Sequence, residues 1–135
     1  MRVLKALVPT LLLVIFVIGT AEAQEKKKDK DGVFFVVEEM PMYPGGDNAL
    51  RDFISQNVKY PKIAVEKGIQ GKVYVTFVVD TDGSVTDSRV VRGVDPSLDK
   101  EALRVVNSLP AWTPGKEKGQ PVKVSYTVPI SFALK

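Results

Sequence analysis

The last stretch of the chain, VKVSYTVPISFALK at residues 122–135, alternates apolar and polar side chains almost without interruption. Successive side chains of a strand point to opposite faces, so this pattern predicts an amphipathic β-strand that covers a core with one face. At roughly 3.3 Å per residue such a run would extend on the order of 40 Å, whereas strands in small domains usually have about 5 or 6 residues. We therefore expect part of it to lack a neighbour and to form an open edge of the sheet.

Two further β-rich runs precede this strand. In residues 72–79 an apolar side chain occupies every second position, and residues 85–92 form a second run rich in β-branched residues. Asp82-Gly83 lies between the two runs, and this dipeptide tolerates the positive φ values that a tight reversal requires. The sequence therefore predicts an antiparallel hairpin.

Three helices are expected around these strands, two before residues 72–79 and one between residues 92 and 122. Apolar residues recur at helical spacing over residues 50–58, with Asp47 available as the N-cap. Pro61 is placed to open a second, shorter helix, and Gly68 to end it in a left-handed conformation. Asp95 followed by proline predicts the start of a third helix, with an N-cap and then proline at the first helical position.

The order of these elements predicts an α+β domain. We expect a small antiparallel β-sheet of three main strands, with the helices packed on one face. Residues 112–120 are expected to form a loop before the last strand. The aromatic residues expected to share the core between helices and sheet are Phe53, Tyr60, Phe77 and Trp112.

The composition limits the chemistry available to this chain. Hydrophobic residues make up 44% and charged residues 26%, which is typical of a globular protein. There is no cysteine and no histidine, so a disulfide, a thiolate metal site and an imidazole base are excluded. We find no candidate catalytic set and expect neither an enzyme nor a bound cofactor or metal. The net charge is +3, and the basic residues do not alternate with aromatic residues as in a nucleic-acid-binding groove, so we expect no nucleic-acid partner.

The N-terminal region predicts export. Residues 1–23 place Arg2 and Lys5 before an apolar run that closes with Ala-Glu-Ala, the layout of a signal peptide. We favour cleavage after Ala23, which gives a soluble periplasmic protein, and keep retention as an inner-membrane anchor as the alternative. Residues 24–44 are expected to form a short tether and a turn-rich lead-in with a possible short strand at 33–37. Residues 45–135 then form the domain.

Several short motifs in this domain follow one another at fixed spacing. They are Tyr60-Pro61 with Ala64, the run from Gly68 to Val79, Asp82-Gly83 with Val85, and Trp112 with Pro114. Together they resemble the C-terminal domain of the TonB family, whose signature reads Y-P-x-x-A, G-x-x-G-x-V-x-V-x-F-x-V, D-G-x-V and W-x-P. The resemblance covers about residues 45–135, and residues 42–46, MYPGG, resemble the variant of the family associated with Bacteroidetes.

This resemblance implies a fold, a function and a set of partners. Members of the family bind outer-membrane receptors in the periplasm and take part in energy-coupled import. A short receptor segment, the TonB box, adds as an extra strand beside the last strand of the domain. The resemblance also implies ExbB and ExbD as partners if the N-terminal segment is retained. The family's Q-P-x-Y-P contact motif falls on residues 57–61, so Asn57 and Tyr60 are candidate contact residues.

The backbone parity of the last strand predicts which groups meet the partner. Neighbouring residues of a strand direct their N–H and C=O groups to opposite sides. Pro129 has no N–H, so its parity should face the open edge rather than the adjacent strand. The predicted partner-binding residues are therefore those of odd number, Lys123, Ser125, Thr127 and Ser131.

Three roles other than energy transduction stay open. Transducing members of the family carry a histidine-bearing membrane helix and a long proline-rich spacer, and this sequence matches neither. Residues 24–32, fully stretched, would reach only about 30 Å. The chain is thus compatible with a soluble adaptor or competitor for TonB boxes, with a domain that acts beside a larger partner, and with a structural module that forms a homodimer through its last strand.

Overall fold

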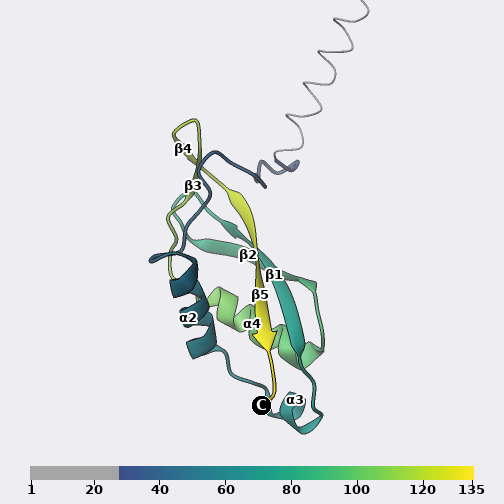
Figure 1. Cartoon of the computed structure of the whole chain (residues 1–135). Helices are drawn as coiled ribbons and strands as arrows, with labels where there is room; N and C mark the ends of the chain where they lie inside the picture. Colours follow the sequence, from purple (N-terminus) through teal and green to yellow (C-terminus); the bar gives the residue numbers. More distant parts are fainter. Residues whose placement is uncertain (1–27) are drawn as a thin grey trace, which may run out of the picture.

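The structure is a computed structural model, and it describes residues 28–135 (Figure 1). Three strands form one antiparallel sheet in the order β2-β1-β5, and two short strands, β3 and β4, form a second. The helices are α2 (Asp47–Asn57), α3 (Lys62–Glu66) and α4 (Pro96–Asn107), and the strands are β1 (Gly71–Val79), β2 (Val85–Arg92), β3 (Gly115–Glu117), β4 (Gln120–Val122) and β5 (Val124–Phe132). The predicted α+β class and three-stranded sheet are confirmed.

All three helices share one face of the three-stranded sheet. The alternate residues of β1 that begin with Val73 are fully buried, and they join Leu50 of α2, Ala64 of α3 and Leu98 of α4 in a single core cluster. This arrangement follows from the alternation of each strand, because it gives the sheet one apolar face against which the helices bury their apolar stripes. From β5 the same cluster takes Val128, Ile130 and Phe132.

The predicted hairpin between β1 and β2 is confirmed, with an antiparallel pairing from Val79 and Val85 outward. Asp82 tightens the turn, since its carboxylate accepts hydrogen bonds from the backbone and the hydroxyl of Ser84 at 2.9 and 2.6 Å. The hydrogen bond from the Ser84 hydroxyl lowers the pKa of Asp82 below its ordinary value. Gly83 adopts the predicted positive φ, at 87°.

The helix ends predicted at Asp95 and Gly68 are found, Pro61 directly precedes α3, and the N-cap predicted at Asp47 is wrong. The side chain of Asp95 caps α4 by accepting a hydrogen bond from Ser97 N, with proline at the first turn. Gly68 follows α3 with a φ of 66° and donates its N–H to Val65 O, as a left-handed helix end requires. The N-cap of α2, however, is Gly46, and Asp47 is already the first helical residue. There its charge lies near the positive end of the helix dipole.

The final strand is shorter than predicted. Residues 120–122 form β4, which pairs with β3 inside the predicted loop, and Lys123 separates β4 from β5. The turn between β3 and β4 places both Lys118 and Gly119 at positive φ, 52° and 77°. Such a turn matches the twist of a two-residue hairpin. The side-chain alternation runs on through Lys123, so the sequence pattern gave no sign of this break.

The segment before α2 lies against the domain. Residues 33–43, called the lead-in below, make only isolated backbone bridges. The short strand predicted at 33–37 is not formed, because Phe34 alone of these residues pairs with a neighbour. Glu39 and Lys116 exchange two hydrogen bonds of 3.1 and 2.8 Å, and Met42 and Thr113 exchange two of 3.0 and 2.9 Å. Backbone contacts with the domain therefore begin ahead of the predicted boundary at residue 45.

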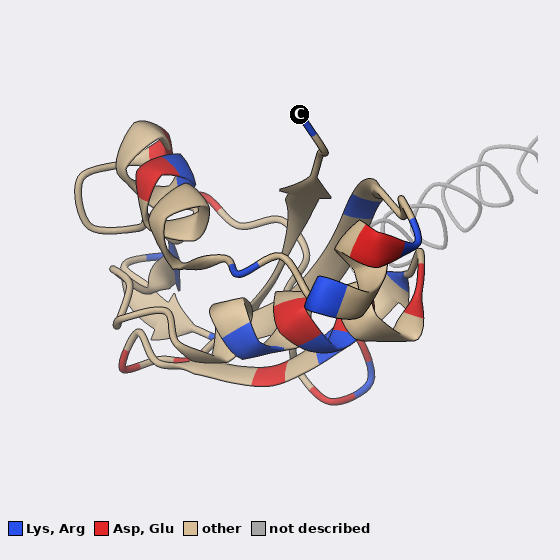
Figure 2. Ribbon diagram, turned by 90° about the horizontal axis from the view of Figure 1, so that it is seen from below, with Lys and Arg blue, Asp and Glu red and all other residues tan. Residues whose placement is uncertain are grey.

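The predicted export signal, residues 1–23, lies outside the described residues. Within residues 28–135, none of the helices has the length and apolar character that a bilayer crossing demands. Lys and Arg are interleaved with Asp and Glu along the helices, so neither sign of charge dominates this layer (Figure 2).

Candidate functional site

β5 forms one edge of the three-stranded sheet. It pairs with β1 over its whole length, from Phe132 opposite Gly71 to Val124 opposite Val79, without any shift of register. In an unshifted antiparallel pair, the backbone groups of alternate residues point toward the neighbour and those of the others point away. One parity of β5 therefore directs its N–H and C=O groups to the outside of the sheet.

A contact from the lead-in identifies the outward parity. Phe34 donates its N–H to Lys123 O and accepts a hydrogen bond from Ser125 N, each at 2.8 Å. Phe34 is thus paired in parallel with Val124 on the side of β5 away from β1. The outward groups at this end belong to the odd residues. Lys123 and Ser125, which the sequence predicted to bind a partner, are therefore hydrogen-bonded to Phe34 of the same chain.

Beyond Ser125 the outer flank of β5 is open. Because the register does not shift, Thr127, Pro129 and Ser131 share the outward parity of Ser125. No residue of the described chain hydrogen-bonds to the backbone of these three on that flank. Their side chains are exposed, on the face of the sheet opposite the helices.

The hydroxyl of Thr127 fixes this part of the strand to its neighbour. It lies 2.7 Å from the hydroxyl of Thr76, which is the residue directly opposite on β1. Thr76 is buried whereas Thr127 is exposed. The side chain of Thr127 is therefore held by the domain, while its backbone groups stay on the open flank.

Tyr60 and Asn57, the other two predicted contact residues, lie on the helical side. The hydroxyl of Tyr60 donates to Ile69 O, and its ring packs edge-on against Phe132 with the centroids 5.5 Å apart. Tyr60 thus contacts the end of β5. Asn57 donates its side-chain amide to Phe53 O at 2.7 Å, within its own helix. The odd residues of β5 lie along one strand edge, and within residues 28–135 no hydrogen bond connects Asn57 to them.

An ion pair on α4 hydrogen-bonds to the backbone next to Asn57. Both carboxylate oxygens of Glu101 accept hydrogen bonds of 2.7 Å from Arg104, which also donates to Asn57 O at 2.7 Å. Glu101 further accepts a hydrogen bond of 2.6 Å from Lys59 N. The hydrogen bond from Arg104 lowers the pKa of Glu101, against the opposing effect of burial. This network positions the connection between α2 and α3.

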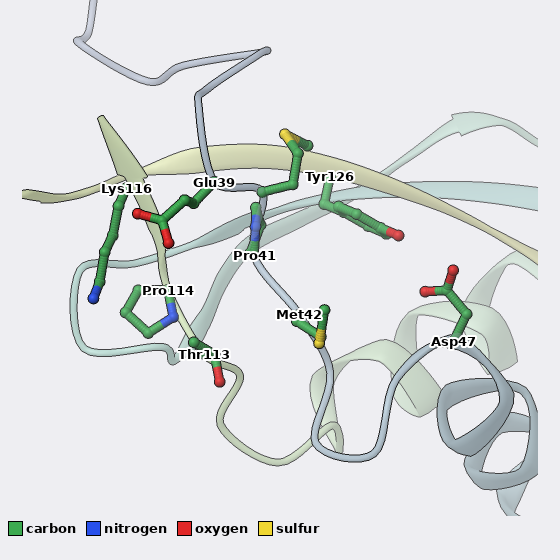
Figure 3. A pocket seen from close by; sticks show the side chains of 9 residues that line it. Glu39, Pro41, Met42, Asp47, Thr113, Pro114, Lys116 and Tyr126 are labelled. Atoms are coloured by element: carbon green, nitrogen blue, oxygen red, sulfur yellow. The ribbon is translucent and has the colours of Figure 1, made fainter. Parts of the chain in front are cut away.

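A hollow of about 650 Å³ lies between the lead-in, α2 and β5 (Figure 3). Tyr126 and Asp47 face this space, and Met42 lines it from the lead-in. Burial raises the pKa of Tyr126, and the carboxylate of Asp47 raises it further. Sequence reasoning missed these residues. The one sequence signal for Tyr126 was its even-numbered position in the alternating last strand, which predicted that its ring lies on the face of the sheet covered by the helices.

No set of three acidic side chains within residues 28–135 is placed to hold a metal ion. The carboxylates of the hairpin turn are engaged locally, since Asp80 accepts from Thr81 N at 2.7 Å and Asp82 from Ser84. The most distinctive feature of the described chain is instead a strand edge that offers backbone donors and acceptors.

Known proteins share sequence and fold with this chain. The model of the family described as Gram-negative bacterial TonB protein C-terminal matches residues 56–134. Protein TonB of Helicobacter pylori is 32% identical over 117 residues, which cover 83% of this chain and 39% of that protein. Protein TonB of Haemophilus influenzae is 36% identical over 95 residues, covering 65% of this chain and 32% of that protein.

A solved structure shows the same fold. The NMR solution structure of the Helicobacter pylori TonB C-terminal domain superposes with a TM-score of 0.51 at 33% identity. The match covers 65% of this chain and 92% of that domain. The chain therefore spans nearly all of the solved domain but only 39% of the full-length Helicobacter pylori protein.

Proposed function

The chain belongs to the family of Gram-negative bacterial TonB C-terminal domains, and on this premise we propose that its domain binds an extended segment of an outer-membrane receptor. The segment, a TonB box, is added as a fourth strand beside β5. Main-chain hydrogen bonds supply the affinity in this mode of recognition, and alternate side chains supply the selectivity. Thr127 and Ser131 are the proposed contact residues, and Lys123 and Ser125 lie on the same flank.

One observation carries this proposal. β5 is an edge strand with unbroken register, and the outward backbone groups of Thr127, Pro129 and Ser131 have no partner within residues 28–135. An unpaired row of N–H and C=O groups is a template for a further strand. Pro129 interrupts the donors of this row, which discourages pairing with a second copy of the chain.

The hollow beside Tyr126 supports the same proposal. An added strand would run next to β5 and alternate its side chains between the two faces of the sheet. On the helical face it would pass the hollow lined by Tyr126 and Met42. Met42 is 59% exposed and has a flexible thioether side chain that adapts to differing partners. Tyr60 contributes at the far end of the strand through its contact with Phe132.

Thr127→Pro tests the proposal, because proline removes one outward N–H and leaves the inward bonds to β1 in place. Titration with a synthetic TonB-box peptide should show at least a tenfold loss of affinity, which corresponds to about 1.4 kcal/mol. Urea unfolding should show that the domain remains folded. Unchanged affinity in a folded variant would contradict binding at this edge.

Thr127→Val is the matched control. It removes the hydroxyl that contacts Thr76 but keeps the backbone N–H. We expect it to bind the peptide as the wild type does. Hydrogen exchange provides a second readout, in which the bound peptide should slow exchange at Thr127 and Ser131. If Thr127→Val lost as much affinity as Thr127→Pro, the side-chain contact and not the backbone edge would govern binding.

The wider role proposed for the protein is participation in energy-coupled import from the periplasm. The relatives named TonB support this role, and it requires recognition of a receptor rather than catalysis. If the N-terminal segment is retained as an inner-membrane anchor, ExbB and ExbD become the proposed motor partners. If it is cleaved after Ala23, the proposed product is a soluble adaptor. The N-terminal residue of the protein purified from cells distinguishes these two forms.

A further inference from the structure

The lead-in occupies the first position of the edge that the proposed function assigns to a receptor peptide. Phe34 uses both of its backbone groups there, bonding to Lys123 O and Ser125 N at 2.8 Å. Resting on the proposed function, we propose that Phe34 is an internal competitor for the peptide. It confines the bound segment to the part of β5 from Thr127 onward, unless the lead-in is displaced.

The contact of Phe34 is narrow. Its neighbours Phe35 and Val36 are 49% and 64% exposed, and within the described chain neither makes a backbone hydrogen bond. Two backbone hydrogen bonds and a half-buried ring therefore hold Phe34 to β5, and the next buried side chain of the segment is that of Val37. The net contribution of such bonds to stability is modest, so a peptide of ordinary affinity can displace this contact.

The contact persists because the segment is tethered to the domain on its C-terminal side. On its C-terminal side, Glu39 exchanges two backbone hydrogen bonds with Lys116. Before Phe34, Asp29 closes a local turn by accepting from Val33 N at 3.0 Å and donating its own N–H to Val33 O at 2.8 Å. A tethered segment has a high effective concentration, so even a weak contact is populated.

This competition lowers the apparent affinity for any peptide that extends past Thr127 toward Ser125. When only a fraction of the molecules is free to bind, the apparent dissociation constant rises by the inverse of that fraction. Releasing the lead-in should therefore tighten binding and lengthen the paired segment. Tighter binding and a longer paired segment can each be measured independently of whether the peptide binds at Thr127 and Ser131.

Phe34→Pro in the full chain tests the inference, because proline cannot donate to Lys123 O. Val36→Pro is the matched control, since Val36 is exposed and its backbone makes no hydrogen bond within residues 28–135. With the synthetic TonB-box peptide, Phe34→Pro should bind about 5- to 10-fold more tightly than the wild type and Val36→Pro equally. In the peptide-free protein, exchange of the Ser125 amide should be faster in Phe34→Pro.

The outcomes separate the inference from the proposed function. If the peptide protects Thr127 and Ser131 in both proteins, with equal affinity for the wild type and Phe34→Pro, the edge is real and the competition is refuted. If the peptide protects neither residue in either protein, the proposed function itself fails. Tighter binding by Phe34→Pro together with new protection at Ser125 in its complex supports the competition.

Discussion

Replacing Gly83 with alanine should destabilise the domain by more than the cost of placing an alanine at a positive φ. Gly83 is a buried turn residue with a φ of 87°. It accepts a hydrogen bond of 2.8 Å from Trp112 N and donates its own N–H to Asp80 O at 2.9 Å. A Cβ at this position would overlap the carbonyl oxygen of Trp112 and lie 3.0 Å from its carbonyl carbon. The turn and the segment at Trp112 must therefore separate.

The magnitude follows from three contributions. An alanine held in the left-handed region costs about 1–2 kcal/mol. The less flexible unfolded chain offsets this by about 0.4–1 kcal/mol. Separation breaks the hydrogen bond from Trp112 N to Gly83 O and leaves buried groups unpaired, at a cost of about 1–3 kcal/mol. We therefore expect Gly83→Ala to lower the free energy of unfolding by about 3 kcal/mol.

Urea unfolding measures this effect, with the fluorescence of Trp112 as the probe. Trp112 is the only tryptophan in the chain and is 4% exposed, so its emission reports the loss of the core. At a slope of about 1.5 kcal/mol/M, the midpoint should fall by about 2 M with the slope unchanged. Circular dichroism should give the same midpoint if the domain unfolds in two states.

Gly119→Ala is the control for the conformational contribution. Gly119 has a φ of 77°, and a Cβ there would meet no atom within 4 Å. We expect its midpoint to fall by only about 0.5 M, since the two conformational effects nearly cancel. Equal shifts for Gly83→Ala and Gly119→Ala would refute the reasoning, because the overlap with Trp112 would then contribute nothing.

Three further changes test the site and its support. Glu101→Gln should flatten the dependence of stability on pH, because the hydrogen bond from Arg104 lowers the pKa of Glu101 in the folded state. The contribution of Glu101 to the free energy of unfolding is present above the ordinary glutamate pKa and is lost as the pH falls through the pKa of the folded state. Urea midpoints of both proteins across the acidic range measure this, and identical profiles would contradict it. Thr76→Val and Thr127→Val should show a coupling of about 1 kcal/mol in a double-mutant cycle, because the two hydroxyls lie 2.7 Å apart; additive effects would rule the bond out as a contributor. Pro129→Ala restores a donor to the outer edge and should strengthen self-association about tenfold in sedimentation experiments, since two hydrogen bonds are gained in a symmetric pair; no change would mean that proline does not protect the edge.

Much of the fold could be predicted because its signals are local. The hairpin between β1 and β2 follows from alternation on either side of Asp82-Gly83. The N-cap at Asp95 likewise depends only on residues within one helical turn. Where the local signal was ambiguous the prediction failed, as at Asp47, because either Gly46 or Asp47 could have preceded the first helical residue.

The candidate site was predictable in part. The alternation of the last strand and the missing N–H of Pro129 indicated an edge with odd residues outward, since parity is a property of the strand itself. The position of Asn57 was not predictable in this way. Its backbone oxygen is bound by Arg104, 47 positions along the chain, and its side chain bonds to Phe53 within the same helix.

The sequence by itself determined the hairpin of β1 and β2, the helix ends at Gly68 and Asp95 and the parity of β5, because each depends on neighbours within a few residues. Only the tertiary structure decided how much of that edge is free. Phe34 reaches β5, and Glu38 bonds to Lys118 80 positions away, through contacts that involve single residues and leave no periodic pattern. Such contacts form because chain closure brings distant segments together, and closure depends on the packing of the whole domain rather than on any one stretch of sequence.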